Sequence, residues 1–142
     1  MPAPAPEDRL RFLAPAWLEA LDEEAARLSL PADVRLTLQQ VVTGTDGPGD
    51  RGVPEKTEVR YHLVAGDGRL SVRPGQALDP DLTLTQPYHV AVAISRGALN
   101  AQQALSTGRL KISGNVELLV RHGRVLTGLT DIYAPLRDRT DY

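Results

Sequence analysis

The chain of 142 residues has no cysteine and few aromatic residues, with one Trp, one Phe and four Tyr. Without cysteine it forms no disulfide, has no thiol nucleophile and binds no metal through sulfur. No stretch approaches 18 consecutive apolar residues, so the sequence predicts no membrane-spanning helix. A formal net charge of -2 argues against a general nucleic-acid binder, because such proteins need a basic face to neutralise phosphates.

Aliphatic residues are what the sequence does contain in quantity. Hydrophobic residues make up 42% of the chain, and nearly all of them are Leu, Val, Ile and Ala. A chain of this length corresponds to one domain and removes about two-thirds of its surface from water on folding. We therefore expect a flexible lead-in at residues 1–11, a single domain at residues 12–135 and a charged tail at residues 136–142.

The first helix is predicted between Phe12 and Leu28. Apolar residues recur there at spacings of three and four, which is the period of an amphipathic helix. Pro31 ends the segment, because proline lacks the backbone N–H that a helix interior needs.

Strands follow, because the apolar period then changes to two. Alternation of apolar and polar residues predicts strands at residues 34–43, 57–64 and 69–73. The turn Gly66-Asp67-Gly68 predicts that the last two pair as an antiparallel hairpin. The stretch Gly44–Pro54 is rich in Gly, Pro and Asp and is predicted to be a poorly ordered loop.

The second half alternates short strands with helices. Strands are predicted at residues 82–85 and 109–113, and a largely buried helix at residues 88–96, which are apolar nearly all round. Asn100 is a good N-cap for a short helix. A further helix is predicted from Asn115 through Val120, running on toward the segment 125–133. The whole order indicates an α+β domain with one sheet covered by helices on one face.

Catalytic and metal-binding patterns are absent from the sequence. His62, His89 and His122 fall in separate predicted elements without metal-ligand spacing, so surface positions are expected for them. No serine lies in a GxSxG elbow. The sequence thus predicts no catalytic residue, no metal site and no cofactor.

Two polar pairs are candidate functional groups. Asp79 and Asp81 flank Pro80, and their ordinary role would be turn chemistry, in which Asp accepts hydrogen bonds from nearby backbone N–H groups. The competing role is a carboxylate pair for acid–base catalysis. Tyr88 and His89 precede a predicted helix and could polarise a ligand group, although Tyr88 is better explained as a lid over the core.

Three motifs in the second half carry a family resemblance. They are LTLT at residues 82–85, AVAISRGALN at residues 91–100 and GRLKISGN at residues 108–115. In this order, over about Asp81 to Leu119, they resemble the sterol carrier protein type-two domain family. Leu105 departs from the pattern, because family members often carry Phe at that position.

The resemblance implies a five-stranded mixed, mainly antiparallel sheet with helices over one face, enclosing an apolar tunnel or cavity. It also implies non-catalytic binding, and transfer, of fatty acids, acyl-CoA esters, sterols and phospholipids. The residues expected to line the cavity are aliphatic and come from both layers: Leu84, Val90, Ile94, Leu105, Leu110, Ile112, Val116, Leu119 and Val120. The same residues would serve equally well as a packed core, and periodicity does not distinguish the two.

Three functions follow, in order of preference. The first is a lipid-binding protein of the bacterial cytoplasm, since arginine outnumbers lysine 14 to 2 and residues 1–8 do not have the pattern of a signal peptide. Its partner would be an apolar small molecule, with a homodimer left open. The second is a structural or interaction module of the same fold that supports a partner protein or enzyme. The third is an enzyme that uses Tyr88, His89 or Asp81.

Overall fold

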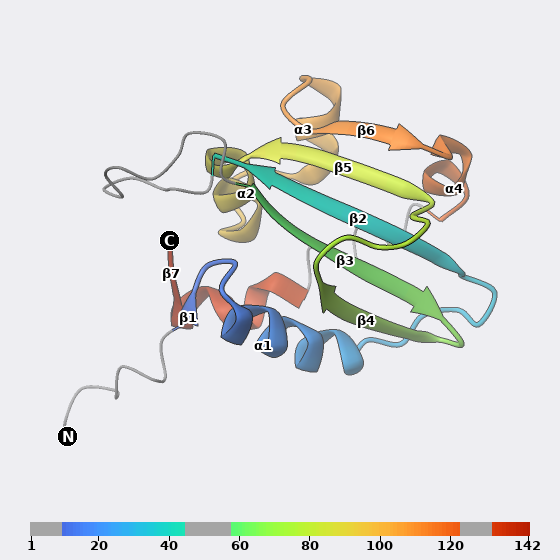
Figure 1. Ribbon diagram of the computed structural model, residues 1–142, viewed down its shortest axis with the longest axis horizontal. Helices are drawn as coiled ribbons and strands as arrows, with labels where there is room; N and C mark the ends of the chain where they lie inside the picture. Colours follow the sequence, from blue (N-terminus) through green and yellow to red (C-terminus); the bar gives the residue numbers. More distant parts are fainter. Residues whose placement is uncertain (1–9, 45–57, 123–131) are drawn as a thin grey trace.

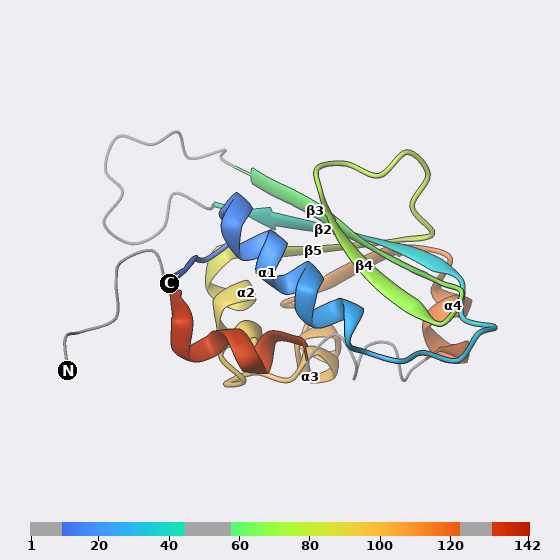
Figure 2. The same cartoon turned by 90° about the horizontal axis from the view of Figure 1, so that it is seen from below.

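The computed structural model describes residues 10–44, 58–122 and 132–142. Within them one open sheet carries helices over one face (Figures 1 and 2). The elements in chain order are β1 (Leu10–Arg11), α1 (Pro15–Ala26), β2 (Leu36–Thr43), β3 (Glu58–Gly66), β4 (Arg69–Pro74), β5 (Leu82–Pro87), α2 (Tyr88–Ser95), α3 (Ala101–Ser106), β6 (Lys111–Gly114), α4 (Val116–Arg121), η2 (Ala134–Arg139) and β7 (Thr140–Asp141).

The main sheet has five strands in the order β4-β3-β2-β5-β6. Strand β2 pairs with β5 in parallel, and the other three pairings are antiparallel. Figure 2 shows the sheet nearly edge-on, with α1, α2 and α3 on the same side of it. The predicted α+β fold, with a mixed and mainly antiparallel five-stranded sheet, is confirmed.

The predicted hairpin is formed by β3 and β4. Asp67 and Gly68 have φ values of 55° and 76°, as the tight turn favoured by twisted hairpins requires at both central residues. Gly66 and Arg69 close the turn as register partners. The local sequence is therefore sufficient to set this register.

Helix α1 begins at Pro15, three residues later than predicted. The backbone takes a φ of 68° at Leu13, a conformation that a right-handed helix does not continue through. Phe12 is instead tied to the end of the chain, because its N–H donates to the carbonyl oxygen of Asp141 at 2.9 Å.

A connecting segment, residues 75–81, crosses the outer face of the sheet between β4 and β5 and is called the strap below (Figure 1). Gln39, on that face of β2, is completely buried. Its side-chain oxygen accepts from the N–H of Ala77 at 2.7 Å, and its amide nitrogen donates to the carbonyl oxygens of Tyr61 and Gly75 at 3.2 and 3.3 Å. Gln39 thus holds the strap on the sheet with its own polar atoms satisfied.

The last residues differ from the predicted charged tail, because they pack on the fold. Strand β7 pairs with β1 in parallel, and both Leu136 and Thr140 are buried. The Thr140 hydroxyl donates to the carbonyl oxygen of Leu136 at 2.6 Å. Leu10, within the predicted lead-in, is also buried. A charge-rich segment can pack in this way because its few apolar residues face inward while Arg139 stays exposed.

Two further expectations fall largely outside the described residues. The predicted loop Gly44–Pro54 lies there except for Gly44, and so does most of the segment 125–133. Helix α4 ends at Arg121, and His122 is its C-cap.

Candidate functional site

One row of register partners crosses the helix-covered face of the sheet. Ile112 of β6 pairs with Leu84 of β5, Leu84 with Gln40 of β2, and Gln40 with Tyr61 of β3. Directly paired residues of neighbouring strands share a face. Ile112 is half-buried, whereas Leu84, Gln40 and Tyr61 are buried. The row therefore runs from a partly open aliphatic edge to a closed polar interior.

Most of the predicted lining residues belong to the hydrophobic core of the domain. Leu105 and Ile112 are half-buried and pack against the core. The other residues brought into this core are buried: Leu84, Val90, Ile94 and Leu110. Their role as ligand contacts stays a prediction.

Helix α4 departs from the expected arrangement. Val116 is 48% exposed and Val120 is 85% exposed, so the expectation that both face the sheet is wrong in this structure. A six-residue helix at the end of an edge strand buries only one side, and here Leu118 supplies the half-buried residue. The side chain of Leu119 is not among those described. Whether any of these three touches a ligand stays a prediction.

The opposite end of the row is polar. The amide nitrogen of Gln86 donates to the side-chain oxygen of Gln40 at 2.8 Å, and both residues are buried. The hydroxyl oxygens of Tyr61 and Tyr133 lie 3.0 Å apart. Burial raises the pKa of Tyr61 well above its ordinary value and raises that of Tyr133 as well. Both phenols are therefore neutral near pH 7.

This polar end was not predicted from the sequence, although a signal was present. Gln40 continues the alternation of Leu36 and Leu38, and Gln86 continues that of Leu82 and Leu84, so both fall on the inner face. Glutamine is ordinarily exposed, so the two glutamines conceal the fact that the inward-facing alternation continues through their positions.

Aromatic residues enclose the polar end. Trp17 stacks on Tyr133 with ring centroids 6.0 Å apart and meets Tyr61 edge-on at 6.1 Å. Phe12 contacts Trp17 at 4.9 Å, and it also contacts the two remaining aromatic residues of the chain, Tyr88 and Tyr142. All six aromatic residues thus form one continuous cluster at one end of the interior.

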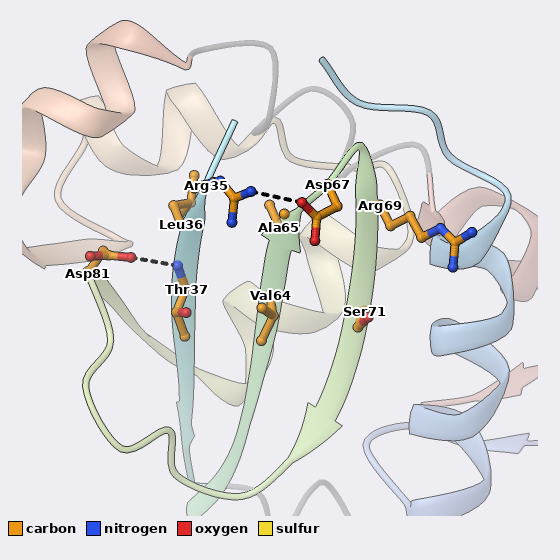
Figure 3. A pocket seen from close by; sticks show the side chains of 10 residues that line it. Arg35, Leu36, Thr37, Val64, Ala65, Asp67, Arg69, Ser71 and Asp81 are labelled. Carbon is orange, nitrogen blue, oxygen red and sulfur yellow. Dashed lines mark hydrogen bonds and ion pairs between the residues drawn. The ribbon is translucent and has the colours of Figure 1, made fainter. Parts of the chain in front are cut away.

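The outer face of the sheet carries a pocket of about 500 Å³ (Figure 3). Arg35 and Asp67 form an ion pair across it at 2.8 Å. The Asp81 carboxylate accepts from the N–H of Thr37 on β2 at 2.7 Å, a bond between distant segments rather than the local turn contact expected of it. Asp79 is exposed. The Asp81 carboxylate is thus engaged with the backbone of β2, and among the described residues no contact joins it to the Asp79 carboxylate.

A second pocket, of about 570 Å³, lies outside α2 against Tyr88, His89, Arg96 and Tyr142. Within the three described ranges, no group of His, Asp and Glu residues could hold a metal ion. No helix among those residues has the length and apolarity needed to cross a membrane.

Comparison with known proteins decides the family. The sequence profile of the SCP-2 sterol transfer family matches residues 19–127. The chain belongs to the SCP-2 sterol transfer family. This family is one of lipid- and sterol-binding domains, and the match spans the sheet, the strap and the helices α2 to α4.

Individual relatives agree with this assignment. The fold is similar to a crystal structure of sterol carrier protein 2 (TM-score 0.67, 17% identity, covering 86% of this chain and 96% of that one). It is also similar to a protein of Thermus thermophilus described as possibly a sterol carrier protein (TM-score 0.68, 16% identity, 92% and 91% covered). A segment of 66 residues, 46% of the chain, is 40% identical to the peroxisomal multifunctional enzyme A of Dictyostelium discoideum and covers 15% of that enzyme.

Proposed function

We propose that this SCP-2 family chain binds a lipid without covalent chemistry, between the inner face of its sheet and the helices α2 and α3. The row from Ile112 to Tyr61 carries the proposal, because it joins a half-open aliphatic edge to an interior with polar groups at its far end. Fatty acids, acyl-CoA esters and sterols are the ligand classes we propose. Aliphatic walls with few hydrogen-bond demands suit such ligands.

The apolar surface alone is sufficient for useful affinity. Burial of one methylene contributes about 0.8 kcal/mol, so a chain of about fifteen contributes at most ~12 kcal/mol. Lost translational and rotational freedom of the ligand offsets several kcal/mol of this. Micromolar or tighter binding therefore requires no charged anchor.

The test is a titration of the delipidated full chain with a fluorescent fatty acid, combined with native mass spectrometry. We expect saturable binding with one ligand per chain at micromolar concentration. Failure of both methods to detect any apolar ligand would contradict the proposal.

A second function has one observation in its favour. The segment shared with the multifunctional enzyme of Dictyostelium is a small part of that protein, so the domain also exists joined to catalytic units. In that role the chain would support a partner enzyme or a second copy of itself. A stable complex on size exclusion with light scattering, together with no lipid uptake, would favour it. Location in a bacterial cytoplasm stays a prediction.

A further inference from the structure

The buried polar end of the sheet, formed by Gln40, Gln86, Tyr61 and Tyr133, has a chemistry suited to one kind of ligand group. We propose that it binds the neutral, hydrogen-bond-accepting head of a lipid, such as an alcohol or an ester carbonyl, and discriminates against ionised heads. The proposal rests on the proposed function and ranks its ligands, placing lipids with neutral heads above ionised fatty acids.

A buried donor without an acceptor is the first observation behind the proposal. Each glutamine amide has two N–H donors, and each phenol has one O–H donor. Between Gln40 and Gln86 one hydrogen bond is formed, and the phenols of Tyr61 and Tyr133 share one. Trp17, packed on both phenols, is completely buried, and its indole N–H has no acceptor. Among the buried side-chain nitrogen and oxygen atoms of the described residues, the indole N–H of Trp17 is therefore the donor left without a partner.

An unpaired buried donor is costly, so the indole N–H of Trp17 favours a ligand that supplies an acceptor. A hydroxyl or carbonyl oxygen does so without bringing charge. Both can accept from an amide, a phenol or an indole N–H.

The absence of buried cations is the second argument. The buried polar residues of the described ranges are uncharged, namely Gln39, Gln40, Gln86, Ser95 and Thr140. An ionised carboxylate or phosphate taken out of water without a cationic partner is strongly disfavoured. The two phenols stay protonated because burial raises the pKa of each, so they remain donors.

The geometry gives the ligand a direction. Neighbouring strands lie about 4.8 Å apart, so the row from Ile112 to Tyr61 spans roughly 14 Å. A head group bound near Gln40 and Tyr61 places the apolar body along Leu84, with its far end at the half-buried Ile112.

The first experiment compares hexadecanol with palmitate at pH 8 by displacement of the neutral dye Nile red from the full chain. We expect hexadecanol to bind about tenfold more tightly. The double variant Gln40→Leu/Gln86→Leu removes both partners of the buried pair, so neither amide is left unpaired, and we expect it to lose this preference. Thr85→Val, on the opposite face of β5, is the matched control and should keep it.

Equal affinity for the two ligands would overturn the proposal, as would an unchanged preference in the folded double variant. If neither ligand displaces the dye and neither binds by native mass spectrometry, the proposed function itself fails.

A second measurement needs no variant. The single tryptophan gives one indole N–H signal in a ¹H–¹⁵N spectrum. Hexadecanol should shift this signal downfield, as a newly formed hydrogen bond does, whereas hexadecane should not. Identical responses to saturating amounts of both ligands would contradict the proposal, whether or not the double variant folds.

Discussion

The hydroxyl groups of Tyr61 and Tyr133 meet inside the core at 3.0 Å, although the two residues are 72 positions apart in the chain. Their hydrogen bond joins β3 to the segment just before η2. Trp17 packs on both rings, so the bond also positions α1 over the sheet. Three distant parts of the chain therefore meet at one polar point in an apolar interior.

This pair predicts a loss of stability at high pH. The folded pKa of both phenols is raised from the ordinary 10.0 by burial, so their contribution is fully present below about pH 10. Above that pH the unfolded phenols ionise first, and the free energy of unfolding falls. With both Tyr61 and Tyr133 replaced by Phe, the free energy of unfolding, measured by urea denaturation, should decrease less between pH 8 and about pH 11. We expect the difference from the unmodified protein to be at least ~1 kcal/mol. An identical pH dependence in both proteins would contradict this explanation.

Ile112→Arg tests the aliphatic edge. Ile112 is half-buried on an edge strand, so the arginine can extend into water and the protein should remain folded. We expect lipid affinity to fall at least tenfold, roughly 1.4 kcal/mol, because the charge lies on the proposed path. Ser113→Arg, the exposed neighbour on the other face, is the control. Unchanged affinity in folded Ile112→Arg would show that this edge does not contact the ligand.

Gln39→Ala should release the strap. The substitution leaves the N–H of Ala77 and two carbonyl oxygens without their side-chain partner, and each unsatisfied buried group costs about 1–3 kcal/mol. We expect a loss of roughly 3 kcal/mol in the free energy of unfolding, with faster hydrogen exchange at Ala77. The exposed Gln76→Ala should change stability by less than about 0.5 kcal/mol. Equal effects of the two variants would mean that Gln39 does not hold the strap.

Tyr142→Ala tests whether the last residues belong to the fold. The Tyr142 ring contacts Phe12 with centroids 5.0 Å apart and lies under the guanidinium of Arg96, also at 5.0 Å. Loss of both contacts should lower the free energy of unfolding by about 2 kcal/mol. Tyr142→Phe keeps the ring and loses only the hydroxyl contact with Ser95, so it should cost less than half as much. A neutral Tyr142→Ala would mean that the last residues add nothing to the stability of the fold.

Local sequence patterns predicted most of the helices and strands, but apart from the hairpin of β3 and β4 they did not predict which strands pair in the sheet. The turn at Asp67 and Gly68 defines the hairpin, and the alternation along β2 gives its inner face without any tertiary information. The parallel pairing of β2 with β5 depends on the path of the strap, which is held by a glutamine rather than by an apolar residue. No local period encodes such a contact.

The burial of most aliphatic residues of the proposed site was predicted from the sequence, whereas its polar residues were missed. Leu84 and Ile94 are buried as their spacing indicates. The expectation that Val120 faces the sheet was wrong, because an apolar residue on a short helix does not show which side of that helix packs against the rest of the protein. The inward position of Gln40 was missed for the converse reason, because a polar residue is not expected to face the core. Its partner there is Gln86, which lies 46 residues away in the sequence.

The most direct test of lipid binding in this interior is an isotope-filtered NOE experiment on the methyl-labelled full chain with unlabelled hexadecanol. We predict intermolecular NOEs to the methyl groups of Leu84, Ile94 and Ile112. NOEs confined to the exposed residues Leu78, Val116 and Val120, or none at saturating ligand, would contradict it.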